Sequence, residues 1–175
     1  MRVLDIIILS LKEASKKLMN TIRRAEAKDV DGILELLIQV DMVHHNARPD
    51  IFKGPATKYT REELLEIFKN DETPVFVSVS DAGHVDGHAF CILKQLKDDH
   101  VLTDIKTLYI DDICVHEKCR GEHIGKSLYE HVVAYAKEIG CYNVTLNVWC
   151  CNENAMRFYE KLGLVPQKIG MEKIL

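Results

Sequence analysis

The 175-residue sequence lacks a long hydrophobic run, an excess of basic residues and any small-residue cleavage site after its apolar start. No stretch approaches the roughly 20 apolar residues of a membrane span, and Asp5 interrupts the most apolar segment, 3–11. We therefore expect neither a signal peptide nor a membrane partner. The formal net charge of -4 argues against a nucleic-acid partner, because a general nucleic-acid binder needs a basic face.

The sequence also lacks paired-cysteine motifs, internal repeats and low-complexity segments. Its six cysteines include no CxxC motif, and His84 and His88 have no predictable third ligand, so we expect no metal site. Hydrophobic residues make up 47% of the chain, which is enough for a buried core. These features predict one globular domain with free thiols in the cytoplasm. The cysteines are Cys91, Cys114, Cys119, Cys141, Cys150 and Cys151.

The apolar pattern predicts alternating strands and helices. Strands are expected over 21–25, 74–80, 87–93, 108–115, 143–149 and 165–175. Helices are expected after an Asp29 cap, after a Thr60 capping box, from Ile124 to Gly140 and after an Asn152 cap, with a loop over 44–58. This order predicts an α/β fold of the α+β type, in which helices cover a mixed sheet. Residues 1–20 form a separate extension, expected to be helical, before a domain over 21–175.

The sharpest motif is the segment Cys-Arg-Gly-Glu-His-Ile-Gly-Lys-Ser over 119–127, between a predicted strand and a predicted helix. Backbone N–H groups at a helix N-terminus, freed by glycines, suit a phosphate. A Walker-type P-loop would need four residues between Gly121 and Gly125, and the sequence has three. The segment instead resembles the pyrophosphate loop of the GNAT superfamily of acyl-CoA N-acyltransferases, [QR]-x-x-G-x-[GA]. It matches at Arg120, Ile124 and Gly125, with His123 replacing the first motif glycine.

The sequence around this loop is also similar to the family. An apolar strand precedes it, and a strand, Asn152 and the Phe158–Leu164 segment follow in the family's order. The resemblance covers 21–175 and implies the GNAT fold. That fold has a mixed, mostly antiparallel central sheet with two splayed parallel strands and helices on both faces.

The resemblance implies that acetyl-CoA, as co-substrate, lies between the splayed strands. The strand backbone would hold the pantetheine arm, the loop amides would hold the pyrophosphate, and the segment after Asn152 would line the channel. We expect the His123 ring to point to solvent, because only a positive φ strictly requires glycine. Asn152 has a simpler alternative role as a helix cap. The predicted cofactor-binding residues are Ile113, Cys114, Val115, Arg120, Gly121, Glu122, His123, Ile124, Gly125, Lys126, Asn152, Glu153, Asn154 and Ala155.

Two residues are the catalytic candidates that the resemblance implies. Tyr159 matches the tyrosine that many members use as general acid toward the leaving thiolate; the alternative is a core aromatic. The stretch ending in Asp111 and Asp112 is similar to the acidic pair of diamine (spermidine/spermine-type) members. There the first acid deprotonates the amine through water, so Asp111 is the expected base. Adjacent strand residues face opposite sides, so Asp112 is expected to be structural or paired with a basic residue. The alternative for both is a satisfied buried carboxylate.

These features together predict an N-acetyltransferase that transfers the acetyl group of acetyl-CoA directly to an amine. The expected acceptor is a primary amine of a small molecule, of polyamine type, with acceptor-pocket candidates Asp41, His45 and Asp50. A peptide N-terminal or lysine acetyltransferase stays open as an alternative. So does a non-catalytic acyl-CoA-binding sensor. Dimers are common in the family, so a homodimer is compatible with the resemblance.

Overall fold

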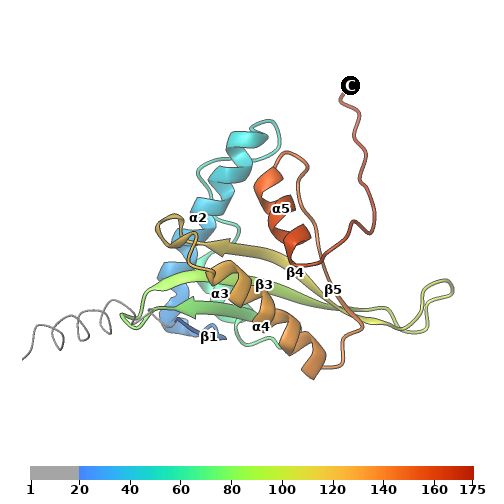
Figure 1. The fold of residues 1–175 in the computed structure, drawn as a ribbon, viewed down its shortest axis with the longest axis horizontal. Helices are drawn as coiled ribbons and strands as arrows, with labels where there is room; N and C mark the ends of the chain where they lie inside the picture. Colours follow the sequence, from blue (N-terminus) through green and yellow to red (C-terminus); the bar gives the residue numbers. More distant parts are fainter. Residues whose placement is uncertain (1–19) are drawn as a thin grey trace, which may run out of the picture.

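The computed structural model describes residues 20–175, which carry a five-stranded sheet in the order β1-β2-β3-β4-β5 (Figure 1). Antiparallel pairs join β1 to β2, β2 to β3 and β3 to β4, whereas β4 and β5 run parallel. This arrangement confirms the predicted mixed, mostly antiparallel sheet. The strands are β1 Thr21–Arg24, β2 Val75–Val79, β3 Val85–Gln95, β4 Lys106–Val115 and β5 Asn143–Leu146.

Helices cover both faces of the sheet, as predicted. Side chains of α2 and α3 pack with Val75, Val77 and Phe90 on one face. Side chains of α4 pack with Phe76 and Ala89 on the other face, because neighbouring strand residues point to opposite sides. The helices are η1 Ala27–Asp29, α2 Val30–Ala47, α3 Arg61–Ile67, η2 Glu117–Cys119, α4 Ile124–Glu138 and α5 Glu153–Lys161. Within residues 20–175, none of them is both long and apolar enough to span a bilayer.

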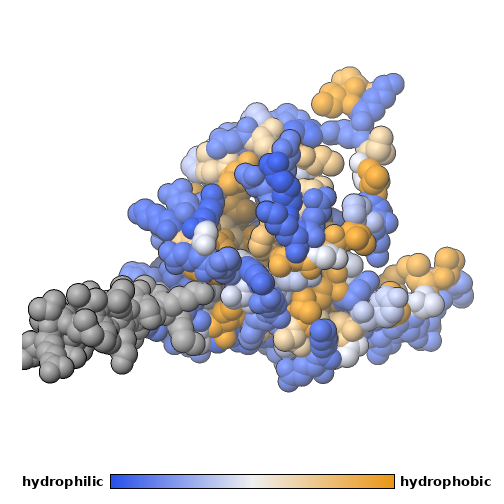
Figure 2. Space-filling view, viewed as in Figure 1, coloured by the Kyte–Doolittle hydropathy of each residue, from blue (hydrophilic) through white to orange (hydrophobic). Residues whose placement is uncertain are grey.

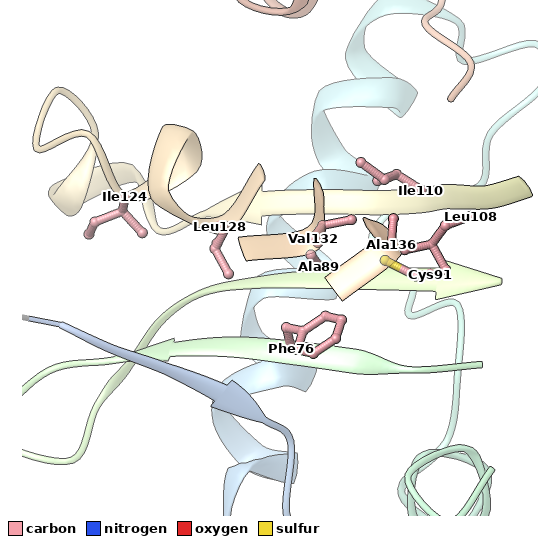
Figure 3. Close-up of a cluster of buried hydrophobic side chains, with 9 residues drawn as sticks. All are labelled: Phe76, Ala89, Cys91, Leu108, Ile110, Ile124, Leu128, Val132 and Ala136. Atoms are coloured by element: carbon pink, nitrogen blue, oxygen red, sulfur yellow. The ribbon is translucent and has the colours of Figure 1, made fainter. Parts of the chain in front are cut away.

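The core on the α4 side fixes the position of that helix. Leu128, Val132 and Ala136 recur at the spacing of one helix face and meet Leu108 and Ile110 of β4 (Figure 3). Leu128 and Val132 are fully buried, and each contributes about 1.5–3 kcal/mol by leaving water. This packing places the first turn of α4 beside the end of β4.

Helix α2 departs from the sequence prediction at both ends. Asp29 occupies the N-cap position as predicted, but its side chain makes no capping hydrogen bond; the carboxylate instead accepts the Glu26 N–H at 2.8 Å and two hydrogen bonds from Arg23. The loop expected from His44 begins later, because the helix continues to Ala47. It ends there because Arg48 precedes a proline, which disfavours the helical conformation at the residue before it.

The strand expected over 165–175 is absent, and that prediction is wrong. The segment has no strand assignment, and Val165, Ile169 and Met171 are largely exposed. Figure 2 shows apolar side chains gathered at the end of the chain and on the projecting β3–β4 hairpin. A strand needs a partner ladder, but the contact recorded for this segment is an ion pair from Glu172 to Arg48. The helix expected in 1–20 falls almost entirely on residues 1–19, outside the described part.

Candidate active site

Strands β4 and β5 separate after four paired positions. The last pair joins Ile110 to Leu146, after which β5 ends and β4 continues to Val115 alongside β3. The predicted strand over 143–149 is therefore shorter than expected. At the point of separation, the Asn147 amide donates a hydrogen bond to the Tyr109 hydroxyl at 3.1 Å. Within residues 20–175, no strand pairs with this edge of β4 beyond Ile110. The splayed parallel strands are thus present.

The backbone of β4 beyond this point presents alternate residues to the opening. The His116 N–H donates to the Asp86 carbonyl at 2.8 Å, so alternation along the ladder turns the Cys114 backbone toward β3. The same alternation turns the backbone groups of Ile113 and Val115 toward the opening. The Val115 carbonyl already accepts a hydrogen bond from the Gln39 amide at 3.1 Å.

Cys114, which was expected to bind the cofactor, has its backbone turned away from the opening. Its backbone pairs with β3, and its sulfur lies 3.2 Å from Gln39 Nε2 of α2. Burial raises the pKa of this thiol to about 12, which keeps it protonated and unreactive. Gln39 is a residue that the sequence analysis missed, and it ties α2 to the end of β4.

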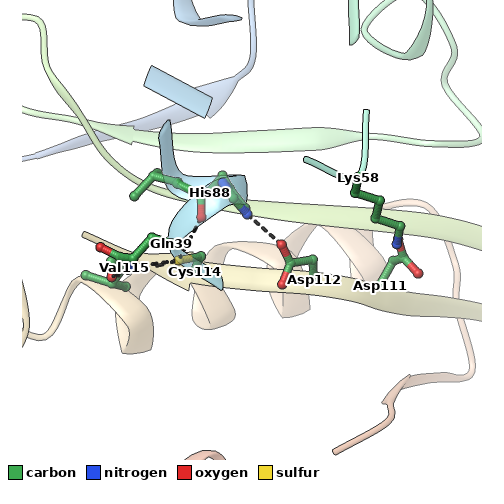
Figure 4. A network of polar contacts seen from close by, with 8 residues as sticks. Gln39, Lys58, His88, Asp111, Asp112, Cys114 and Val115 are labelled. Carbon is green, nitrogen blue, oxygen red and sulfur yellow. Dashed lines mark hydrogen bonds and ion pairs between the residues drawn. The ribbon is translucent and has the colours of Figure 1, made fainter. Parts of the chain in front are cut away.

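A β-bulge at Asp111 brings both acidic residues to the same face of the sheet. Asp112 lies opposite Phe90 and Ile110 lies opposite Cys91, so Asp111 is the extra residue of β4. An extra residue breaks the alternation of side chains. Both carboxylates therefore meet partners on the α2 side (Figure 4). The prediction that they face opposite sides is wrong.

Each carboxylate has a different basic partner. Asp111 forms a very short ion pair with Lys58, which lies in the segment between α2 and α3. Asp112 lies 2.8 Å from Nε2 of His88, as the predicted pairing with a basic residue requires. The His88 ring is fully buried and packs edge-on against Phe90, and its Nδ1 atom has no partner within residues 20–175. The His88–Asp112 pair is thus largely buried beside the opening between β4 and β5.

Tyr159 lies in α5 on the other side of the opening. Burial raises the pKa of its phenol well above the ordinary value, and the negative charge of Asp112 raises it further. The hydroxyl therefore stays protonated at neutral pH and is a donor. Its ring packs at 5.0 Å from Phe158 and is 9% exposed, so the side chain also contributes to packing.

The loop before α4 has the left-handed conformations of an anion-binding turn. Gly121 has a φ of +86° and His123, at the N-cap, a φ of +64°. Glycine adopts this region freely, whereas a histidine is strained there. Position 123 was assumed in the sequence analysis not to need a positive φ, and that assumption is wrong. The His123 side chain is exposed, in line with the predicted orientation toward solvent.

The first turn of α4 leaves backbone donors free and packs closely. The first intrahelical bond runs from the Ser127 N–H to the His123 carbonyl, so the N–H groups of Ile124, Gly125 and Lys126 have no acceptor in the helix. A Cβ atom on Gly125 would lie 3.4 Å from both Phe158 and Val115. The loop, α5 and the end of β4 therefore converge. Arg120, Glu122 and Lys126 are exposed at the same end of the helix.

Asn152 caps α5, because its side chain accepts a hydrogen bond from the Ala155 N–H at 3.1 Å. The alternative role given to it is thus confirmed. Together with Glu153 and Asn154 it also lines a cavity of about 350 Å³ between α2 and α5. Ala155 is not among the lining residues. The others are Val43, His44, Ala47, Cys151 and Arg157.

The three acceptor-pocket candidates instead hold the segment between α2 and α3. Asp41 accepts the Ala56 N–H at 2.9 Å, a ring nitrogen of His45 lies 2.8 Å from the Phe52 carbonyl, and Asp50 pairs with Arg48. The segment also contacts the region after β5, where Phe52 packs edge-on against Trp149 at 5.3 Å.

The residues beside the opening on the α2 side of the sheet were missed in the sequence analysis, because no motif marks them. Lys58 meets Asp111, and the neighbouring Tyr59 ring stacks on Phe90 at 5.5 Å. Lys94 lies 3.4 Å from the centre of the Tyr109 ring. One ammonium group, that of Lys58, thus contacts the acidic pair, while that of Lys94 lies over the Tyr109 ring. Among residues 20–175 no group of three or more His, Cys, Asp or Glu side chains is arranged to hold a metal ion.

Comparison with known proteins agrees with this geometry. The chain matches the model of the acetyltransferase (GNAT) family over residues 16–164. A glucosamine 6-phosphate N-acetyltransferase of Arabidopsis thaliana is 38% identical over 68 residues, which are 39% of this chain and 44% of that protein. The chain thus spans less than half the length of that curated relative.

Two solved structures share the fold. A tetramutant of the BH1408 protein from Bacillus halodurans has a TM-score of 0.84 at 30% identity, over 89% of this chain and 99% of that one. Glucosamine-6-phosphate N-acetyltransferase from Arabidopsis thaliana has a TM-score of 0.66 at 26% identity, over 89% and 97% of the two chains. The family model spans most of the sequence, and the splayed strands have the geometry that the resemblance implies. The chain belongs to the GNAT acetyltransferase family.

Proposed function

We propose that this protein is an acetyl-CoA-dependent N-acetyltransferase that acts on the primary amine of a small molecule. The separation of β4 from β5 carries the proposal, because it leaves unpaired backbone groups beside two carboxylates and a buried phenol. Membership of the family supports the reaction class.

The residues present fit acetyl-CoA. Ile113 and the Val115 N–H provide a hydrogen-bonding edge for the amide groups of the pantetheine arm. The free N–H groups of Ile124, Gly125 and Lys126 suit a diphosphate, with the positive end of the α4 dipole behind them. The cofactor supplies an activated acyl thioester when bound.

Two side chains at the opening would each carry out one proton transfer. An amine attacks only when neutral, so a carboxylate at Asp111, relayed by water, would accept its proton. Tyr159, kept protonated by burial, would donate to the departing thiolate. The acyl group passes directly to the amine, because the nearby thiol of Cys114 is buried and protonated.

The charges at the acceptor side favour an amine that also carries an anionic group. Lys58 contacts Asp111, so a polycation would meet repulsion from the ammonium group of this lysine. An amino sugar phosphate would place its ammonium at Asp111 and its phosphate near Lys58. The names of the curated relatives, which are glucosamine 6-phosphate N-acetyltransferases, support this class over the polyamine.

The test combines binding with turnover. Acetyl-CoA at 100 times its Kd should stabilise the protein by about 2.7 kcal/mol in a thermal-shift titration. CoA release is then measured with glucosamine 6-phosphate, spermidine and a lysine peptide. We expect turnover with the first, and a Tyr159→Phe loss of roughly 10²–10⁴-fold in kcat with the CoA-induced shift retained.

Each other outcome contradicts a named part of the proposal. A preference for spermidine would favour a polyamine as the acceptor class. A preference for the peptide would favour the alternative of a peptide N-terminal or lysine acetyltransferase. Binding of acetyl-CoA without turnover on any amine would favour a sensor. An unchanged kcat in the Tyr159→Phe variant would remove the general-acid assignment.

A further inference from the structure

The Lys58 side chain occupies the place that the proposed reaction reserves for an acceptor amine. Its ammonium contacts Asp111, the bulged residue just beyond the last β4–β5 pair. The carboxylate is 17% exposed, so one group at a time can use it fully. An incoming substrate ammonium must therefore displace Lys58.

The segment that carries Lys58 is held in place from both sides. Asp41 accepts a hydrogen bond from the Ala56 N–H, two residues before Lys58. Immediately after it, Tyr59 stacks on Phe90 of the sheet, and the Thr60 capping box starts α3. The lysine is thus presented to Asp111 by anchored backbone, which lowers the entropic cost of reaction at this position.

We propose that Lys58 is itself an acceptor, and that the protein acetylates its ε-amine in cis when acetyl-CoA is bound and no other amine is present. This inference rests on the proposed function, because it uses the same site and the same co-substrate. It assigns a modification site to a residue that also borders the acceptor pocket.

The step balances without any further reagent. The Lys58 ammonium loses one proton to Asp111, and the neutral nitrogen attacks the thioester carbonyl carbon of acetyl-CoA. The C–N bond forms, the C–S bond breaks, and the nitrogen, cationic after the attack, gives up its second proton, which the leaving thiolate takes up. The products are Nε-acetyl-lysine and CoA. Burial disfavours the ammonium form, but the hydrogen bond to Asp111 and the negative charge of that carboxylate together outweigh burial and raise the Lys58 pKa.

Acetylation would change the site. An amide nitrogen carries no charge, so the ion pair with Asp111 would be lost. The carboxylate would then be open to a substrate ammonium, and Lys58 would no longer attract an anion.

The experiment follows the label residue by residue. The full chain is incubated with deuterated acetyl-CoA and no added amine, sampled over time, and digested with trypsin. Acetylation blocks cleavage at Lys58 and yields peptide 54–61 intact. The exposed Lys53 in the same segment reports chemical acetylation by acetyl-CoA alone. We expect Lys58 to be labelled at least about tenfold faster than Lys53, as general-base assistance predicts.

Two variants and one dilution series test the mechanism. Asp111→Asn, with its folding checked by circular dichroism, should slow labelling of Lys58 at least about tenfold and leave Lys53 unchanged. Lys53→Arg should leave labelling of Lys58 unchanged. A first-order rate independent of protein concentration supports transfer in cis, whereas a rate that rises with concentration overturns it.

Equal labelling of the two lysines, or an undiminished rate in Asp111→Asn, overturns the inference. The same preparation is assayed with glucosamine 6-phosphate. Turnover on that amine with Lys58 unlabelled overturns this inference while the proposed function stands. Absence of both reactions together with absent acetyl-CoA binding overturns both.

Discussion

Replacing His123 by glycine should stabilise the protein, because the backbone at this position is left-handed. The φ of +64° at the N-cap of α4 brings the Cβ atom of an L-residue against its own backbone. That conformation costs about 1–2 kcal/mol for a non-glycine residue. The more flexible unfolded chain of a glycine variant offsets about 0.4–1 kcal/mol of this. The exposed ring offers little packing to lose.

The net gain expected for His123→Gly is therefore about 0.8 kcal/mol, from the midpoints of these two ranges, about 1.5 and about 0.7 kcal/mol. For a chain of this length, such a gain raises Tm by about 1–4 °C. Differential scanning calorimetry measures it. His123→Ala is the matched control, because alanine removes the ring but keeps the Cβ, so its Tm should not rise.

The comparison of the two variants decides the argument. If His123→Gly is no more stable than His123→Ala, the backbone at position 123 does not store the strain energy assigned to it. CoA binding gives a second readout. A solvent-facing ring predicts that both variants keep the wild-type CoA-induced shift, and a weaker shift in both would mean that the imidazole contacts the cofactor.

Two further predictions concern the titration of buried groups. Burial opposes ionisation of Asp29, but its hydrogen bonds from Arg23 and a backbone N–H outweigh burial and hold its pKa below the ordinary value of 3.8. The free energy of unfolding should therefore fall as pH drops below about 4, and Asp29→Asn should flatten that slope in urea titrations; an unchanged slope would refute it. Burial raises the pKa of Cys91 and Cys114 to about 12, so N-ethylmaleimide at pH 7 should modify exposed Cys150 first, and early modification of Cys114 would contradict the assigned burial.

The local elements could be predicted because their causes lie within a few residues. The Thr60 capping box forms as expected, with the Thr60 hydroxyl accepting from the Glu63 N–H and the Glu63 carboxylate accepting from the Thr60 N–H. Gly140 and Gly163 end their helices at positive φ. The alternation in β2 and the apolar face of α4 likewise placed both layers of the core. These patterns, with the Arg120–Gly125 motif, were enough for the fold and the family.

Other features depend on contacts between distant segments. The segment 165–175 was expected to be a strand but has no strand assignment, because no strand within residues 20–175 pairs with it. The Asp29 side chain was expected to cap α2, but its carboxylate accepts hydrogen bonds from Arg23 instead. The His123 strain is a property of the loop's path, which residue types alone do not specify.

Residue types and their spacing were enough to identify which residues could do the chemistry, because acid–base character and helix or strand preference are local properties. How those residues are arranged depends on the folded domain. The bulge at Asp111 turned two adjacent carboxylates to one face, and Lys58 and His88 became their partners from distant parts of the chain. Pairing register and loop paths arise from packing across the whole domain, so no local pattern encodes them.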